Sequence, residues 1–487
     1  MTQKNTCVNI FSDITDTHTP FEYFGVHSLG EWYVFRLRAA EADEIFLVGD
    51  FNFWGDSDKM TRITDDGVWE VKIDKSRVLG DAKYKYKIVQ NENAFMISDP
   101  CAFWNERSSE NASIVFDVDG YSWRDRGWLK YRERSILKAI LPINIYEIDL
   151  RHWKERNNFS YKNIASDLAP YVKQMGFTHV CIDFFYENSR SMCVPDCYLG
   201  TPKEFMSFVD SMHEAGIGVL LNIDGFLRVV SATNDADLFG SCVLFWHKKY
   251  HIDGFLYDKM EEYVKKSFCL AETKDTDRKG VYISTRYDYF FVDKKEVLGN
   301  EAFSLIKQFF SENINEYYDR NSFNRLIYAH RAISGVNVLF MGEEVYQPND
   351  FDHCSYVQWD LLENEKNSNY QNFISDMNNF VIMNPDICNA LDVKGNIMLD
   401  RSKGILADVC KNEKYLLLTN FSTNEYGSFE FKLNNQGLYK EIFNSDDKSY
   451  GGYSDLNYKE ICTDALTNTF TVKLLPMSIV IFRSIKN

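Results

Sequence analysis

The sequence predicts an α/β protein in which a (β/α)8 barrel lies between an N-terminal β-sandwich and a C-terminal all-β domain. Three observations predict this fold class. Short runs of alternating apolar and polar residues fill the first quarter of the chain, strand and helix patterns then follow one another, and alternation returns near the C-terminus. The length of 487 residues suits about three domains of roughly 150 residues each.

The first quarter of the chain contains the predicted β-sandwich. Residues 1–20 are polar and are expected to form a loose extension, and residues 21–125 are assigned to the sandwich. Runs such as Trp32–Leu37 and Tyr84–Val89 alternate with a period of two, as strands with one buried face do. Turn residues separate the runs, which favours antiparallel strands.

Residues 126–385 carry the repeated strand–helix pattern. The expected strands are 143–150, 179–185, 218–224, 255–258, 281–284 and 337–341. The expected helices are 163–175, 201–214, 237–250, 301–317 and 323–334. Parallel strands need crossover helices, so this repetition indicates a parallel sheet closed as a barrel. The segment is close to the norm of about 250 residues for such a barrel, which leaves little chain for long loops.

Residues 386–487 return to alternation and predict a small C-terminal β-sandwich. Its clearest expected strands are 415–419, 427–433, 469–475 and 478–483.

Composition excludes several classes of partner. A net charge of −17 repels phosphate groups, which excludes nucleic acid and anionic membrane surfaces, whereas a neutral polysaccharide is compatible with it. The N-terminus shows no secretory signal and no apolar run reaches about 18 residues, so we expect a cytoplasmic protein without membrane spans. Eleven scattered cysteines, Cys193 and Cys197 included, are expected to be free thiols, with no metal and no cofactor.

Several motifs occur along the chain in one order. They are Val48–Trp54 (VGDFNFW), Ile145–Glu147, Leu168–Val180 (LAPYVKQMGFTHV), Leu199–Pro202, His251–Gly254, Phe340–Glu344, Asn444–Asp446 and Tyr450–Gly452. The sequence thereby resembles the glycogen (1,4-α-glucan) branching enzymes of the α-amylase superfamily, glycoside hydrolase family 13, over nearly its whole length. The resemblance implies an immunoglobulin-like sandwich of the starch-binding type, that is, a carbohydrate-binding module. It also implies a catalytic-like TIM barrel.

The resemblance also implies an active site, and most of its residues are changed. Retaining cleavage of an α-1,4 bond needs a carboxylate nucleophile and a carboxylic acid/base about 5–5.5 Å apart. Asp258 stands at the nucleophile position, but the neighbouring family arginine is Leu256, and Thr285 occupies the acid/base position. Asn222 and Leu227 replace the Asp and His of a third motif, and the final H-D-E motif is absent. Without these groups, the sequence predicts a pseudoenzyme.

Other carboxylates and histidines lie near the expected strand ends. Asp183, Glu187, Asp224, Glu343 and Glu344 could supply a new carboxylate pair, although solvated loop carboxylates are the simpler interpretation. His247 and His251 lie four residues apart on a predicted helix face, but no third ligand completes a metal site.

The N-terminal module offers three candidate sugar contacts. Trp54 and Trp69 have rings that can stack on a glucose face, and Lys87 can donate to hydroxyls. Packing of the module against the barrel is the competing interpretation for these residues.

Three hypotheses follow. The leading one is a branching-enzyme-like protein of glycogen or starch metabolism that is catalytically inactive and acts by binding α-glucan or a partner enzyme. The second is an active glucan-branching, remodelling or hydrolysing enzyme with relocated catalytic groups. The third is a scaffold subunit that docks on an active branching enzyme and binds no sugar.

Overall fold

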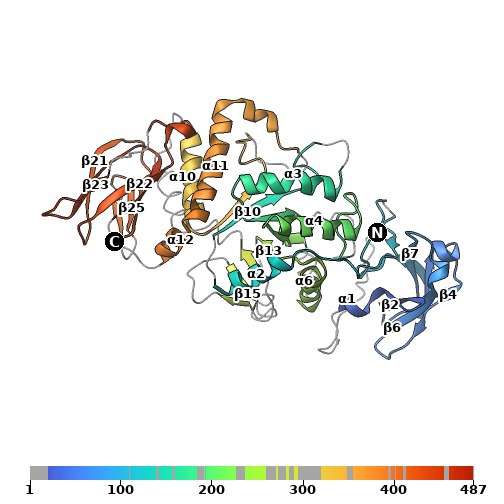
Figure 1. Ribbon diagram of the computed structural model, residues 1–487. Coiled ribbons are helices and arrows are strands. Elements are labelled where there is room, and N and C mark those ends of the chain that lie inside the picture. The colour runs from blue at the N-terminus through green and yellow to red at the C-terminus, as the bar shows by residue number, and fades with distance from the viewer. Residues whose placement is uncertain are drawn as a thin grey trace.

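The computed structural model describes most of the chain, and every structural statement below refers to the residues it describes. These are residues 20–108, 110–138, 142–155, 159–183, 191, 193–225, 236–258, 270–272, 281–284, 290–293, 320–347, 355–392, 396–400, 402–409, 413–454 and 460–485. Figure 1 shows an elongated molecule with a β-rich part at each end and helices packed on strands in the middle. The expected extension at residues 1–19 and the expected helix at 301–317 lie outside this description.

The N-terminal part is a sandwich of two antiparallel sheets that follows the short helix α1 (Pro20–Tyr23). One sheet has the order β1 (Gly25–Leu29), β2 (Trp32–Arg38), β6 (Val68–Asp74) and β5 (Thr61–Arg62). The other has the order β4 (Asp58–Lys59), β3 (Glu44–Gly49), β7 (Lys83–Gln90) and β8 (Asn93–Ile97), with β9 (Ser113–Ile114) also paired to β7. Phe35, Ile45 and Tyr84 are completely buried between the sheets, as the period-two pattern predicts.

The central part alternates strands and helices around one sheet. Its elements are α2 (Arg126–Lys138), β10 (Ile143–Ile148), α3 (Tyr161–Gln174), β11 (His179–Asp183), α4 (Pro202–Glu214), β12 (Gly218–Asn222), α6 (Ala236–Tyr250), β13 (Gly254–Tyr257), β14 (Leu270–Glu272), β15 (Val281–Ser284), β16 (Phe290–Asp293), α10 (Arg320–Ile333) and β17 (Val336–Phe340). The sheet has the order β14-β15-β16-β13-β12-β11-β10-β17, and all its neighbours from β16 to β17 are parallel. This parallel run is the part of a barrel wall that the expected fold requires.

One strand departs from the expected parallel pattern. The strand at Val281–Ser284 forms, but it pairs antiparallel with both β14 and β16. Only residues 285–289 separate β15 from β16, and a parallel crossover needs a dozen or more residues. The parallel neighbour of β13 is therefore β16, a strand that the sequence pattern did not predict.

Capping residues set the ends of the helices beside the sheet. The Ser160 hydroxyl accepts from the Asn163 N–H at the start of α3. Thr201, the residue before Pro202, forms a reciprocal capping box with Glu204 at the start of α4. Both helices are followed by a glycine at positive φ, Gly176 at 69° and Gly216 at 77°, a conformation that residues with a side chain rarely adopt.

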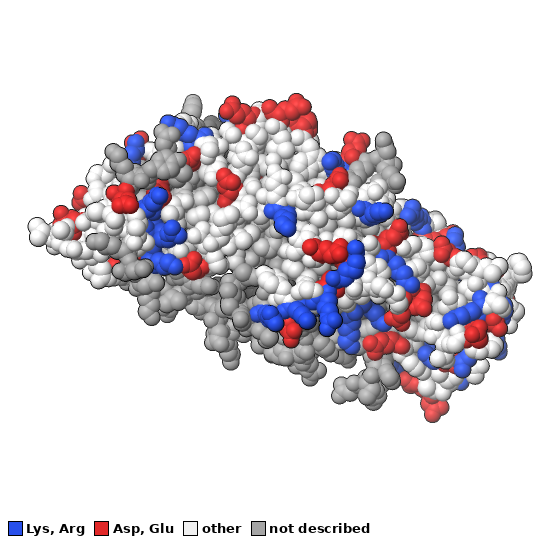
Figure 2. Space-filling model, in the orientation of Figure 1, with Lys and Arg blue, Asp and Glu red and all other residues white. Residues whose placement is uncertain are grey.

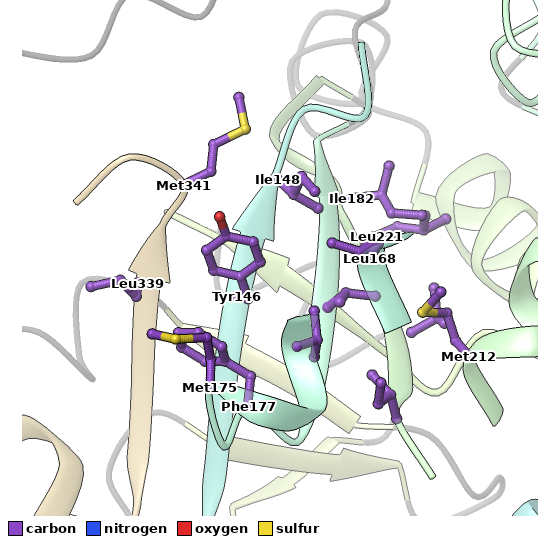
Figure 3. Close-up of a cluster of buried hydrophobic side chains, with 14 of the residues drawn as sticks. Tyr146, Ile148, Leu168, Met175, Phe177, Ile182, Met212, Leu221, Leu339 and Met341 are labelled. Atoms are coloured by element: carbon purple, nitrogen blue, oxygen red, sulfur yellow. The ribbon is translucent and has the colours of Figure 1, made fainter. Parts of the chain in front are cut away.

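A continuous apolar layer joins these helices to the sheet. Figure 3 shows Tyr146 and Ile148 of β10, Ile182 of β11 and Leu221 of β12 meeting Leu168 of α3 and Met212 of α4. All six side chains are at most 4% exposed. This layer holds the strands in fixed register, so the residues at their carboxyl ends have defined neighbours.

After β17 the chain forms η3 (Trp359–Glu363), α11 (Glu365–Met383), whose buried side chains join the core around the central sheet, and α12 (Pro385–Asp392). A sheet then follows in the order β18 (Asn396–Asp400), β19 (Ile405–Val409), β20 (Tyr415–Asn420), β25 (Ser478–Ser484), β22 (Leu438–Asn444) and β23 (Ile461–Cys462), and β21 (Tyr426–Lys432) pairs with β24 (Thr469–Leu474). Residues 385–392 are thus helical where the sequence pattern indicated a return to strands. Arg325 of α10 ties the parts together, since its guanidinium donates to the backbone oxygens of Ser445 at 2.8 Å and Tyr450 at 3.0 Å.

In the described part of the chain, no helix combines the length and hydropathy needed to cross a bilayer.

Candidate functional site

The carboxyl ends of β10 and β12 form a small polar cluster. Glu147 of β10 is 2% exposed, and the side-chain amide of Asn222, the last residue of β12, donates to its Oε1 at 3.0 Å. The Asn222 side-chain oxygen in turn accepts from the backbone N–H of Asp224 at 3.0 Å. Asn222 therefore uses its amide to donate to a buried carboxylate, which a carboxylate at this position could not do.

Asp258, the predicted nucleophile position, lies beside this cluster. It follows the end of β13, and its backbone N–H donates to Oδ1 of Asp224 at 2.9 Å. The structure thus brings two carboxylates that the sequence singled out, Asp224 and Asp258, into one neighbourhood.

Leu256 occupies the place on the same strand where a cation would support Asp258. The side chain is completely buried in an apolar cluster with residues such as Leu220, Phe290 and Val292. Asp258 comes two residues after Leu256, just past the end of β13, so Leu256 lies on the strand face that leads to Asp258. On this face the residue before Asp258 is therefore a hydrocarbon side chain.

The remaining predicted catalytic positions fall partly outside the description. Thr285, Glu187 and Leu227 lie outside the described residues. The strand that leads to Thr285 is β15, which is not the neighbour of β13. The strand that does pair with β13 is β16, and its register sets Asp293 opposite Tyr257.

Glu344 is part of the protein interior. It is completely buried, and it accepts from the hydroxyls of Tyr146 at 2.6 Å and Tyr171 at 2.9 Å and from the N–H of Gly342 at 2.8 Å. Burial raises the pKa of Glu344 to about 7, against the opposing effect of these donors. Three donors fixed by neighbouring elements indicate a structural role for this carboxylate.

The two histidines considered as a metal pair have other partners. Nδ1 of His247 lies 2.9 Å from the backbone oxygen of Ile252, and Nδ1 of His251 lies 2.7 Å from Oδ2 of Asp125. Within the described ranges, no group of three His, Cys, Asp or Glu side chains could hold a metal ion.

His251 borders a buried ionic cluster that sequence reasoning missed. His213 of α4 lies between two carboxylates, with Nδ1 at 2.9 Å from Asp125 and Nε2 at 3.0 Å from Asp253. Arg132 of α2 pairs with Asp253 at 3.0 Å. The cluster joins α2, α4 and the start of β13 at the amino-terminal end of the sheet, opposite the catalytic end of such barrels. The His251–Gly254 motif was the one sequence signal of it.

Trp54 lies in the loop that follows β3, and its side chain is 37% exposed. Its indole N–H donates to Oδ1 of Asp50 at 2.9 Å, which fixes the orientation of the ring. Figure 1 shows β4, which follows this loop, on the side of the module away from the barrel. A ring in this position can accept a ligand.

Lys87 of β7 lies on the outer face of the same sheet. Its ammonium group is 2.6 Å from Asp56 and lies over the ring of Phe46 at 5.8 Å. Strand pairing sets Phe46 and Met96 on either side of Lys87, and Met96 is 50% exposed. These neighbours form an apolar surface with a cation at its centre.

Trp69 differs from both of these residues. It is 5% exposed within the sandwich core, and its indole N–H donates to the backbone oxygen of Ala39 at 3.0 Å. A ring enclosed by the two sheets offers no free face to a sugar, so the packing interpretation describes this residue.

Comparisons with known proteins follow the same division of the chain. Residues 23–102 match the family described as carbohydrate-binding module 48 (isoamylase N-terminal domain), and residues 403–484 match the alpha amylase C-terminal all-beta domain. The chain is 24% identical over 573 positions to a 1,4-alpha-glucan branching enzyme of Bacillus caldolyticus, covering 91% of this chain and 85% of that protein. It is 30% identical over 302 positions to the enzyme of that name from Fusobacterium nucleatum, covering 52% of this chain and 49% of that protein.

Solved structures confirm the predicted fold class. A pullulanase from Paenibacillus barengoltzii matches with a TM-score of 0.64 at 12% identity, over 95% of this chain and 94% of that one. A putative alpha amylase from Salmonella typhimurium matches with a TM-score of 0.62 at 13% identity, over 95% and 99%. The 573-position alignment is longer than the 487 residues of this chain, so that relative contains segments with no counterpart here.

Proposed function

Because this chain belongs to the 1,4-α-glucan branching enzyme family of the α-amylase superfamily, we propose that it acts in cytoplasmic α-glucan metabolism by binding glucan and does not catalyse branching. The single observation that carries the proposal is the buried Leu256 beside Asp258. The resemblance implies an arginine at this position, and the Leu256 side chain offers neither a charge nor a hydrogen-bond donor to Asp258.

The neighbouring polar groups support the same conclusion. Asn222 stands at a position where the family carries an aspartate, and its amide is engaged with buried Glu147. Asp224 accepts the backbone N–H of Asp258. These groups satisfy one another within the protein, as buried and half-buried polar groups generally do.

The N-terminal module supplies the glucan-binding part of the proposal. Trp54 has a partly exposed ring held by Asp50, and Lys87 is held by Asp56 beside the exposed Met96. Glucose rings have apolar faces and hydroxyl edges, so an aromatic ring and a fixed cation are complementary to them. Trp54 and Lys87 are the proposed contacts, and buried Trp69 is left out.

Two measurements on the purified full chain test this proposal. Incubation with amylose should leave the iodine colour unchanged and produce no new α-1,6 ends. Affinity gel electrophoresis in amylose should retard the protein, and Trp54→Ala should reduce the retardation. Formation of α-1,6 branches by the wild type, absent in Asp258→Asn, would overturn the proposal of inactivity. Equal mobility with and without amylose would overturn glucan binding.

A second candidate is an enzyme with relocated catalytic groups, which the proximity of Asp224 and Asp258 favours. The backbone N–H of Asp258 donates to Oδ1 of Asp224 at 2.9 Å, so two acidic residues lie together at the carboxyl ends of neighbouring strands. The candidate predicts an activity on maltooligosaccharides that both Asp258→Asn and Asp224→Asn abolish. Chromatography of maltoheptaose digests decides between the candidates, because an unchanged substrate excludes this one.

A third candidate is a subunit that docks on an active branching enzyme. The outward face of α2 carries Arg126, Lys130 and Arg134, all exposed and spaced four residues apart, and none forms an ion pair with a described residue. Figure 2 shows Lys and Arg gathering over this region, while Asp and Glu are spread across the rest of the view. A cationic stripe on a chain of net charge −17 suits an acidic protein surface. Salt-sensitive co-sedimentation with a purified branching enzyme, lost on reversal of these three charges, is the test.

A further inference from the structure

We propose that Phe53 is a second aromatic platform for α-glucan, adjacent to Trp54, so that the module binds a chain of several glucose units and not a single sugar. This inference rests on the proposed glucan-binding function and extends it. Phe53 stands at the variable place of the motif VGDFNFW, whose other residues match the pattern of the family it resembles.

The exposure of Phe53 is the first observation. Its side chain is 95% exposed, whereas Phe35 of the same module is completely buried. Exposing an aromatic ring to water is unfavourable, because its apolar area stays in contact with solvent and is not buried in the core. An isolated exposed ring at the surface of a binding module is what a ligand would cover.

The backbone conformation is the second, independent observation. Phe53 has φ of 53° and Trp54 has φ of 61°, so two consecutive residues with bulky side chains adopt the left-handed region. This region is unfavourable for every residue with a Cβ atom, and glycine is its usual occupant. Strain that persists at two adjacent aromatic residues is typical of a functional site.

The loop is also braced from both sides, which explains how the strain is maintained. Asp50 accepts from the Trp54 indole and from the Lys83 N–H, each at 2.9 Å. The Asn52 side chain accepts from Gly49 N–H at 2.9 Å and donates to the Leu47 backbone oxygen at 2.8 Å. These bonds fix the loop backbone and the orientation of the Trp54 ring, so little backbone ordering remains when a ligand binds.

The surroundings favour a sugar over a protein partner. Phe53 and Trp54 are consecutive residues, and their side chains are 95% and 37% exposed. The residues around them are charged, including Asp50 and Asp56. A protein interface would have a contiguous apolar patch, whereas a glucan offers alternating apolar faces and hydroxyls.

Isothermal titration of the full chain with maltose, maltotetraose and maltoheptaose tests the proposal. Phe53→Ala should weaken the binding of maltoheptaose about three- to tenfold, the effect expected for the loss of one stacked ring. The loss for maltose should be smaller, because one remaining ring can hold a disaccharide. Leu29→Ala is the matched control, since Leu29 is 57% exposed on the other sheet of the module. This variant should bind maltoheptaose with the affinity of the wild type.

Phe53→Gly separates binding from folding. Glycine adopts this backbone conformation without strain, so the variant should melt no lower than the wild type while losing affinity to the same extent as Phe53→Ala. Wild-type affinity in both variants, with binding lost in Trp54→Ala, would refute the role of Phe53 and leave the proposed function intact. No binding of any oligosaccharide by the wild type would refute the proposed function itself.

Discussion

Replacing Asp253 by asparagine should destabilise the barrel strongly. This residue is completely buried at the start of β13. Its carboxylate accepts from His213 Nε2 at 3.0 Å, Arg132 at 3.0 Å, the Trp128 indole at 2.9 Å and the Val219 N–H at 2.6 Å. The substitution removes the negative charge and turns one acceptor into a donor that faces other donors.

The magnitude follows from burial. Arg132 is 7% exposed and His213 is 3% exposed, so neither can recover its solvation when Asp253 loses its charge. Removing one partner of a buried ion pair typically costs about 3–5 kcal/mol. For a unit of this size each kcal/mol shifts the melting temperature by roughly 2–4 °C, so we expect a fall of roughly 6–20 °C.

Differential scanning calorimetry measures this fall, and it separates the barrel transition from those of the flanking domains. Glu44→Gln is the control, because it breaks an ion pair with Lys59 that is about half exposed on both sides and should cost at most about 1 kcal/mol. A shift for Asp253→Asn no larger than that of the control would refute the reasoning.

The same cluster predicts a pH dependence. Burial alone would raise the pKa of Asp253, but positive His213 and Arg132 outweigh it and hold this pKa well below its usual value of 3.8. Burial alone would lower the pKa of His213, but Asp253 and Asp125 raise it above its usual value of 6.5. The lowered pKa of Asp253 contributes to the free energy of unfolding above about pH 3.8, and this contribution is lost as the pH falls through the pKa of the folded state. The raised pKa of His213 contributes below about pH 6.5, and this contribution is lost as the pH rises through the raised pKa. The difference in melting temperature between wild type and Asp253→Asn should therefore be largest between about pH 4 and 6.5, and a difference that does not vary with pH would contradict this.

Three further substitutions test individual environments. Trp69→Ala should cost about 3–5 kcal/mol, because it empties the sandwich core, whereas Trp54→Ala should change stability by at most about 0.5 kcal/mol, and thermal melts of both variants decide this. Asn222→Asp should cost about 1–3 kcal/mol at pH 7, since it replaces a donor to buried Glu147 with a second carboxylate; equal melting temperatures for variant and wild type at pH 7 would contradict it. Leu256→Arg should not restore branching in the iodine assay and should lower the melting temperature, because the guanidinium would enter an apolar cluster.

The order of motifs made the broad architecture predictable. Strand and helix periods located α3 and α4 to within two residues, because their caps and terminal glycines are local signals. The same periods could not reveal that β15 turns back on β16, since strand direction depends on which strand lies alongside. Direction is therefore a property of the whole sheet.

For the candidate site, the chemical groups present can be read directly from the sequence. Leu256 beside Asp258 is visible there, and so is the tryptophan of VGDFNFW. The surroundings of each group follow from the tertiary structure. It enclosed Trp69 and left Phe53 exposed, although both are aromatic residues of one module. It also set Asn222 against Glu147, 75 residues away along the chain. Local patterns record the identity and spacing of side chains, whereas burial and pairing depend on which distant segments meet in the fold.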